Sequence, residues 1–215
     1  MRRTTRLKKL RISSLNHLDR LRQHIMVIGP TMPEQIIEMR MSFVVIQLQN
    51  LWANFVRAYY LSCMLGTRRE GGAVVRVTTP GLPLNTALGR AVRTFRAGAT
   101  ANTVGAWHRR DEPKWHETRV IDTLSVNEGF SNRTEILAAL SISSRVFLDL
   151  PFFRNYFAHK SDQTSDAARN VSPLYGMAIP KKPSQVLLGR AMGRPQRLIE
   201  DWIDDLSLVM EYLCH

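Results

Sequence analysis

An arginine, an asparagine and a histidine occur close together in one short run, Arg154-Asn155-Tyr156-Phe157-Ala158-His159. Histidine is the side chain best suited to take up and deliver protons near neutral pH. The planar guanidinium of arginine stays charged and donates paired hydrogen bonds to a phosphate. The run therefore contains groups that could cleave an RNA phosphodiester through its own 2′-hydroxyl, which in principle needs no metal ion.

The spacing of Arg154 and His159 limits what one copy of the run can do. At ~100° per residue, five residues place two side chains of a straight helix well over a quarter turn apart. The long arginine side chain, a helix end near His159 or a second subunit must close the gap, and a two-fold dimer would bring two copies together. The amide of Asn155 could then hold the histidine or the phosphate. The structural alternative is an Arg154 paired with a carboxylate and a His159 at a helix end.

The elements that carry this run are expected to be helical. Apolar residues recur at helical spacing over residues 14–27, 34–65 and from 195 to the end, with Gly66 as the stop of the second stretch. Whether 34–65 is one helix or two stays open. Asn132 and Glu135 fit a capping box that opens a helix over 133–150. Residues 160–184 are expected to be loop, and 74–78 a short strand.

Length and composition predict one main domain with appendages. The 215 residues allow one substantial core. We predict a basic N-terminal arm with a short helix over residues 1–30, and a helical domain over 31–215 with an insert at about 67–118. Scattered Gly and Pro residues mark this insert, in which a short helix over 84–96 is expected. The predicted fold class is all-α, an antiparallel helical bundle with a basic N-terminal arm and a loop-rich insert.

The charge of the chain is strongly positive. The 30 Lys and Arg residues exceed the 18 Asp and Glu residues, which gives a net charge of +12. Such an excess favours a polyanion as partner, although a solvated basic surface or an acidic protein partner would also fit. Aromatic and basic residues also occur together at 107–116, as a stacking surface for single-stranded RNA requires. The RNA-binding candidates are Arg109, Arg110, Lys114, Trp115 and Lys160, with core or loop anchors as the alternative for the aromatic side chains.

The segment FRNYFAHK around Arg154 and His159 resembles the R-x4-6-H signature of the HEPN (higher eukaryotes and prokaryotes nucleotide-binding) superfamily of helical domains. Asn50-Leu51-Trp52 resembles its first core helix, and residues 112–116 resemble a segment before its central helix. The resemblance covers roughly residues 34–160, apart from 67–106. It implies an HEPN-like bundle and an endoribonuclease that acts as a toxin or antiviral effector.

The same resemblance implies a homodimer that cuts RNA where the arginine and histidine of both subunits meet. Arg154, Asn155 and His159 are then the catalytic candidates. An inhibitor or a larger defence complex would be a further partner. Toxins that nucleotidylation silences carry a tyrosine two positions after the histidine, whereas this chain has Ser161. That form of control is therefore not expected.

Other classes of function lack their sequence patterns. The chain has no P-loop or dinucleotide motif, and His108 and His116 lack the ligand spacing of a zinc site, so we expect no cofactor or metal. No apolar run is long enough to span a membrane. Cys63 and Cys214 have no CxxC partner and fit a reducing cytoplasm. The competing hypothesis is a non-catalytic helical module that binds RNA or a protein, with Arg154 and His159 as ligands or interface groups.

Overall fold

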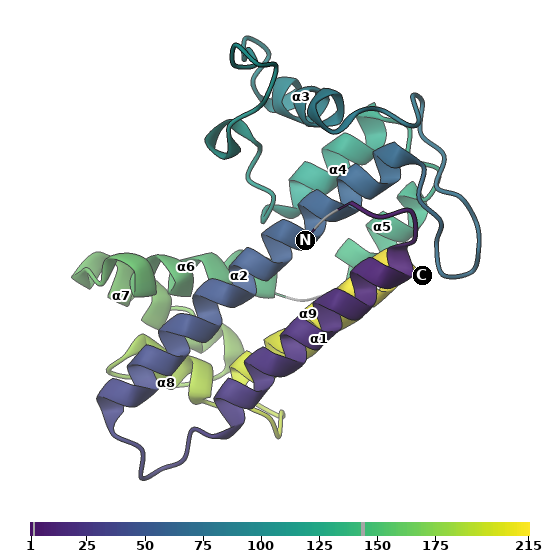
Figure 1. Ribbon diagram of the computed structural model, residues 1–215. Coiled ribbons are helices and arrows are strands. Elements are labelled where there is room, and N and C mark those ends of the chain that lie inside the picture. Colours follow the sequence, from purple (N-terminus) through teal and green to yellow (C-terminus); the bar gives the residue numbers. More distant parts are fainter. Residues whose placement is uncertain (2, 143–144) are drawn as a thin grey trace. The chain divides into compact units, whose positions relative to one another are not determined.

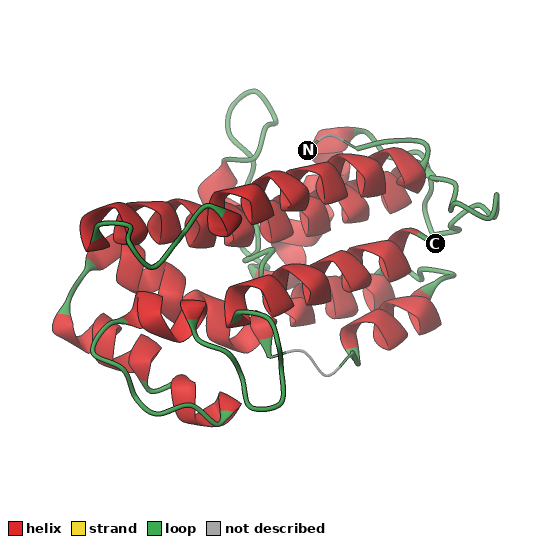
Figure 2. Cartoon of the chain, turned by 90° about the horizontal axis from the view of Figure 1, so that it is seen from below, coloured by secondary structure: helices red, strands yellow, loops and turns green. Residues whose placement is uncertain are grey.

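The computed structural model of the protein describes residues 1, 3–142 and 145–215, and the regular elements in these ranges are helices (Figure 1, Figure 2). The predicted all-α class is therefore confirmed. No helix in the described ranges is long and apolar enough to cross a membrane. The elements are α1 (Leu7–Met26), α2 (Glu34–Leu65), α3 (Leu84–Phe95), η1 (Arg109–Asp111), α4 (Thr118–Asn127), α5 (Arg133–Leu140), α6 (Val146–His159), α7 (Asp162–Arg169), η2 (Ser172–Tyr175), α8 (Pro183–Leu188) and α9 (Leu198–Cys214).

The two most apolar stretches form helices, although the second begins at Leu198 rather than at the predicted residue 195. Residues 34–65 form one helix, α2, which ends before Gly66, a residue with a positive φ of 84° that suits glycine. The apolar stripe of α9 is buried throughout, including Trp202 and Leu206. Burial of these stripes stabilises the fold, because each fully buried large apolar side chain contributes roughly 1.5–3 kcal/mol.

The prediction of a single helix over residues 133–150 is wrong. The structure has α5, which ends at Leu140, and a separate α6, which begins at Val146. The side chain of Asn132 does not cap α5, because it is buried and its Nδ2 donates to the hydroxyl of Tyr59 at 2.6 Å. A buried amide needs a partner, and here a distant residue supplies it.

Three further local predictions are corrected. Residues 160–184 are not all loop, since Ser161 and Thr164 form a reciprocal capping box that opens α7. Residues 74–78 form no strand within the described chain and contribute only an isolated bridge between Val74 and Arg68. The first helix begins at Leu7 rather than near residue 14, because Leu7 is buried and Arg11 pairs with Glu70. Part of the predicted basic arm is therefore helical.

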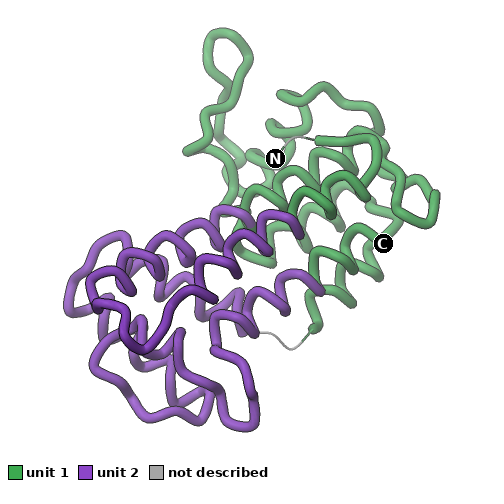
Figure 3. The backbone as a smooth tube through the Cα atoms, turned by 60° about the horizontal axis from the view of Figure 1, so that its bottom comes forward, with its two compact units in different colours: residues 1–14, 52–142, 209–215 green, residues 15–51, 143–208 purple. Residues whose placement is uncertain are grey.

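The chain divides into two compact units (Figure 3). Unit 1 contains residues 1–14, 52–142 and 209–215, and unit 2 contains residues 15–51 and 143–208. Each unit contains residues of the predicted arm and residues of the predicted main domain. The predicted domain boundary at residue 30 therefore stays a prediction. The core of unit 1 includes stacked aromatic rings, with Tyr60 and Phe130 at 6.1 Å between centroids. Cys63 and Cys214 are buried and free.

Candidate functional site

The three catalytic candidates lie on one helix of unit 2. Arg154, Asn155 and His159 belong to α6, whose last residue is His159. The histidine and the asparagine are exposed, and Arg154 is half-buried. Because α6 stays helical to its end, Arg154 and His159 point about 140° apart around it. One copy of the helix therefore does not place the two side chains next to each other.

The side chains of Arg154 and His159 are free of hydrogen bonds and ion pairs with the described residues. The structural alternative requires a carboxylate next to Arg154, and residues 1, 3–142 and 145–215 provide none within ion-pairing distance. His159 does lie at the helix end, as that alternative also predicts. Both groups are thus available to a ligand or to another protein chain.

An exposed stripe of α6 contains His159, and it is partly apolar. Leu148, Phe152, Asn155 and His159 follow each other at spacings of four, three and four residues, so they share one face of the helix. Leu148 is 65% exposed and Phe152 is 43% exposed. We call these four residues the α6 stripe. Leu148 and Phe152 were not among the predicted site residues, although their helical spacing from His159 places them on the same face of α6.

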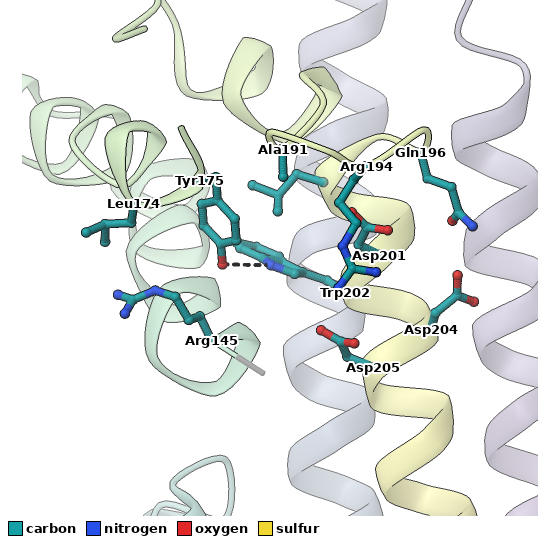
Figure 4. A pocket seen from close by; sticks show the side chains of 11 residues that line it. Arg145, Leu174, Tyr175, Ala191, Arg194, Gln196, Asp201, Trp202, Asp204 and Asp205 are labelled. Atoms are coloured by element: carbon teal, nitrogen blue, oxygen red, sulfur yellow. Dashed lines mark hydrogen bonds between the residues drawn. The ribbon is translucent and has the colours of Figure 1, made fainter. Parts of the chain in front are cut away.

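The side of α6 about a quarter turn from this stripe is held by a hydrogen-bond network around the buried Asp149, of which Figure 4 shows Arg145, Tyr175 and Trp202. The indole Nε1 of Trp202 donates to the hydroxyl of Tyr175 at 3.0 Å, and that hydroxyl donates to Asp149 Oδ2 at 2.8 Å. Arg145 donates to both carboxylate oxygens of Asp149 from Nε and Nη2. Burial and the adjacent carboxylate raise the pKa of Tyr175, which therefore remains a neutral donor. The network fixes the rotation of α6 and so keeps the α6 stripe facing outward.

A second group of contacts holds α6 near the candidate run. Phe153 packs edge-on against the ring of Trp202, with 5.5 Å between centroids. The hydroxyl of Tyr156 lies near the carboxylate of Glu38 on α2, and burial together with this carboxylate raises the pKa of Tyr156. Ser184 at the start of α8 donates to the same carboxylate. Tyr156 and Glu38 therefore position α6 through its inner face and do not join the exposed stripe.

A cavity of about 300 Å³ lies beside the Asp149 network (Figure 4). Its wall includes Tyr175, Trp202 and the charged side chains of Arg194, Asp201 and Asp205. Burial and the nearby acidic side chains raise the pKa of Asp201, while Arg194 opposes that shift. None of the three catalytic candidates lines this cavity. The cavity is therefore distinct from the candidate site.

Lys160 follows α6 in a conformation that is unusual for its residue type. Its φ of 48° and ψ of 40° are left-handed, a position where glycine is preferred because a Cβ adds strain. Its backbone N–H donates to the carbonyl of Tyr156 at 2.7 Å and closes the helix. The side chain of Lys160 is exposed directly after His159.

The other RNA-binding candidates lie in unit 1 around the buried carboxylate of Glu112. Arg57 Nε donates to Glu112 Oε2 at 2.6 Å, and Arg109 Nη1 donates to the same oxygen at 2.8 Å. The indole Nε1 of Trp115 also donates to it, at 2.7 Å, and Trp115 is only 3% exposed. Its ring is therefore part of the core, which is the alternative that the sequence left open for these aromatic side chains. It does not offer a face to an RNA base.

The remaining basic candidates of this segment are on the surface. Arg110 is exposed in η1. The ammonium of Lys114 is 3.5 Å from Glu117 and largely solvated, so that ion pair is weak. Together with Arg109, whose side chain is half exposed, these residues form a basic surface of unit 1. The structure therefore places the RNA-binding candidates in both units, with Lys160 alone beside the catalytic candidates.

The described residues contain no group of three or more His, Cys, Asp or Glu side chains arranged to hold a metal ion. Comparison of the chain with protein-family models, with curated proteins and with solved structures finds no match.

Proposed function

We propose that the protein is a metal-independent endoribonuclease that works as a homodimer, with Arg154, Asn155 and His159 as its catalytic residues. The observation that carries the proposal is the exposed, unbonded His159 on a helix face shared with Asn155 and two exposed apolar side chains. The resemblance of this run to the HEPN signature adds the role of a toxin or antiviral effector in the cytoplasm. It also leaves room for an inhibitor or a larger defence complex as partner.

The proposed reaction is attack by the 2′-hydroxyl of RNA on the adjacent phosphorus. The imidazole of one His159 takes the proton of the 2′-hydroxyl as the 2′-oxygen bonds to phosphorus. The bond from phosphorus to the 5′-oxygen breaks, and the same imidazole, now protonated, gives this oxygen its proton. Arg154 stabilises the negative charge that builds up on the phosphoryl oxygens. The products are a 2′,3′-cyclic phosphate and a 5′-hydroxyl.

The dimer is part of the proposal because one α6 lacks the required geometry. The angle of about 140° between Arg154 and His159 keeps the two groups of one copy apart. An isologous contact through the α6 stripe would bury Leu148 and Phe152 against their counterparts and bring two His159 side chains together. The arginine of one copy could then act with the histidine of the other.

The proposal is tested by incubating the purified protein with end-labelled single-stranded RNA in excess EDTA. We expect cleavage to continue in EDTA, and we expect the upstream fragments to end in 2′,3′-cyclic phosphate. Mass spectrometry of the fragments distinguishes this end from a plain 3′-hydroxyl. Plain 3′-hydroxyl ends would contradict the mechanism. RNA that is bound but left uncut would instead favour a non-catalytic RNA-binding module.

A further inference from the structure

A small cavity in unit 1 lies between one face of α3 and the loop that follows this helix. Its volume is about 180 Å³, below the roughly 300–1,000 Å³ of pockets for drug-sized ligands. Asn85, Thr86, Gly89 and Arg93 line it from α3, and their spacing places them on one side of the helix. Trp107 lines it from the loop. The cavity therefore suits one flat group of the size of a nucleobase.

Trp107 is held at this cavity by a close approach to α3. A Cβ on Gly89 would lie 2.8 Å from the indole Nε1, so only glycine lets the ring rest against the helix here. The guanidinium of Arg93 lies over the ring, with its Cζ 5.4 Å from the ring centroid. The indole is half-buried, unlike Trp52, Trp115 and Trp202, which are all buried. Trp107 is thus a preorganised aromatic surface with a cation beside it.

The surroundings of Trp107 are basic. No acidic residue occurs between residues 71 and 110. Of the six arginines in this segment, Arg90, Arg96 and Arg109 pair with Glu128, Asp111 and Glu112. Arg76, Arg93 and Arg110 make no ion pair with the described residues. The side chain of Arg93 is exposed and has no ion-pair partner among the described residues. Arg96 Nη1 lies 3.7 Å from Asp111 Oδ1, which brings η1, with the exposed Arg110, to the end of α3. The positive charge favours a polyanion over an uncharged aromatic ligand.

We propose that this cavity, at Trp107 and Arg93, binds a nucleotide of single-stranded RNA. The base stacks on the indole, and Arg93 pairs with the adjoining phosphate. The exposed side chains of Asn85 and Thr86 can hydrogen-bond to the edge of the base, which a duplex would keep paired. The choice of RNA as the polyanion rests on the proposed ribonuclease function. The site itself lies outside the residues proposed for catalysis, so binding and cleavage can be tested separately.

The test measures binding of a fluorescent single-stranded RNA to the full chain carrying His159→Ala, which keeps the RNA intact. Adding Trp107→Ala is expected to weaken binding roughly tenfold or more, because it removes one base–aromatic stack. Trp107→Phe retains a ring and should weaken binding less. Arg93→Gln should weaken binding more than Arg76→Gln, a matched loss of charge at an exposed arginine of the same segment. Double-stranded RNA should show no dependence on Trp107.

Tryptophan fluorescence gives a second, independent readout. Because the other three tryptophans are buried, stacking of a base should quench mainly the emission of Trp107, and Trp107→Phe should abolish this quenching. Unchanged affinity in Trp107→Ala and Trp107→Phe, or equal effects of Arg93→Gln and Arg76→Gln, would overturn the proposal. If the wild type does not cleave RNA but binds it in a manner that depends on Trp107, the proposed ribonuclease function is contradicted and the binding site at Trp107 is still supported.

Discussion

Replacing His159 with alanine is expected to lower the rate of RNA cleavage about 10²- to 10⁴-fold, the usual contribution of a group that transfers protons in the transition state. The side chain is exposed and makes no hydrogen bond with any described residue, so its removal should leave the free energy of unfolding within about 0.5 kcal/mol of the wild type. Initial rates with end-labelled RNA measure the first quantity, and thermal unfolding measures the second.

The matched control for this variant is His215→Ala, which removes another exposed imidazole. It should cleave RNA at the wild-type rate. If His159→Ala cleaves as fast as this control, His159 has no catalytic role.

Replacing Phe152 with glutamate is expected to convert the dimer into a monomer and to remove nearly all cleavage activity. In an isologous contact the new carboxylate would face its own counterpart, and like charges at an interface cost several kcal/mol. Since 1.4 kcal/mol corresponds to a factor of ten, the dimer dissociation constant should rise at least about 100-fold. Sedimentation at several protein concentrations measures that constant, and the cleavage rate should follow the fraction of dimer.

Leu208→Glu is the matched control for Phe152→Glu. Leu208 lies on α9 in the same unit and is 41% exposed, against 43% for Phe152. The control should remain dimeric and active, because its exposed apolar side chain lies outside the α6 stripe. A wild type that is monomeric at all concentrations, or a monomeric Phe152→Glu variant with full activity, would contradict the composite site.

Local sequence patterns predicted the long helices because those patterns describe burial on one face. The stripes of α2 and α9 are long and regular, and Gly66 correctly predicted the end of α2, whereas α9 begins at Leu198 and not at the predicted residue 195. The break between α5 and α6 could not be predicted in the same way. Asn132 has the local spacing of a helix cap, but its amide bonds to Tyr59, 73 residues away. A partner so distant in the chain leaves no trace in the local pattern.

The candidate site was predictable to a similar extent. The helical spacing of Arg154 and His159 already indicated that a straight helix does not place the two groups side by side, and α6 has this geometry. Trp107 and Trp115 of the insert are each followed by a histidine, so the sequence alone did not distinguish their roles. Trp115 is buried and donates a hydrogen bond to the carboxylate of Glu112, whereas Trp107 packs against Gly89 and is only half-buried. The partner that decides each role lies outside the pair itself.

The central claim is that one arginine and one histidine from different copies act on the same phosphate. It is tested most directly by mixing two inactive variants, Arg154→Ala and His159→Ala, under conditions that exchange subunits, and measuring the rate of RNA cleavage. A mixed dimer retains one intact pair, Arg154 of one chain and His159 of the other. The account predicts that cleavage returns on mixing, to an appreciable fraction of the wild-type rate. If the two variants exchange subunits but the mixture stays inactive, while the wild type cleaves RNA in the same assay, the claim of a site shared between two copies is contradicted.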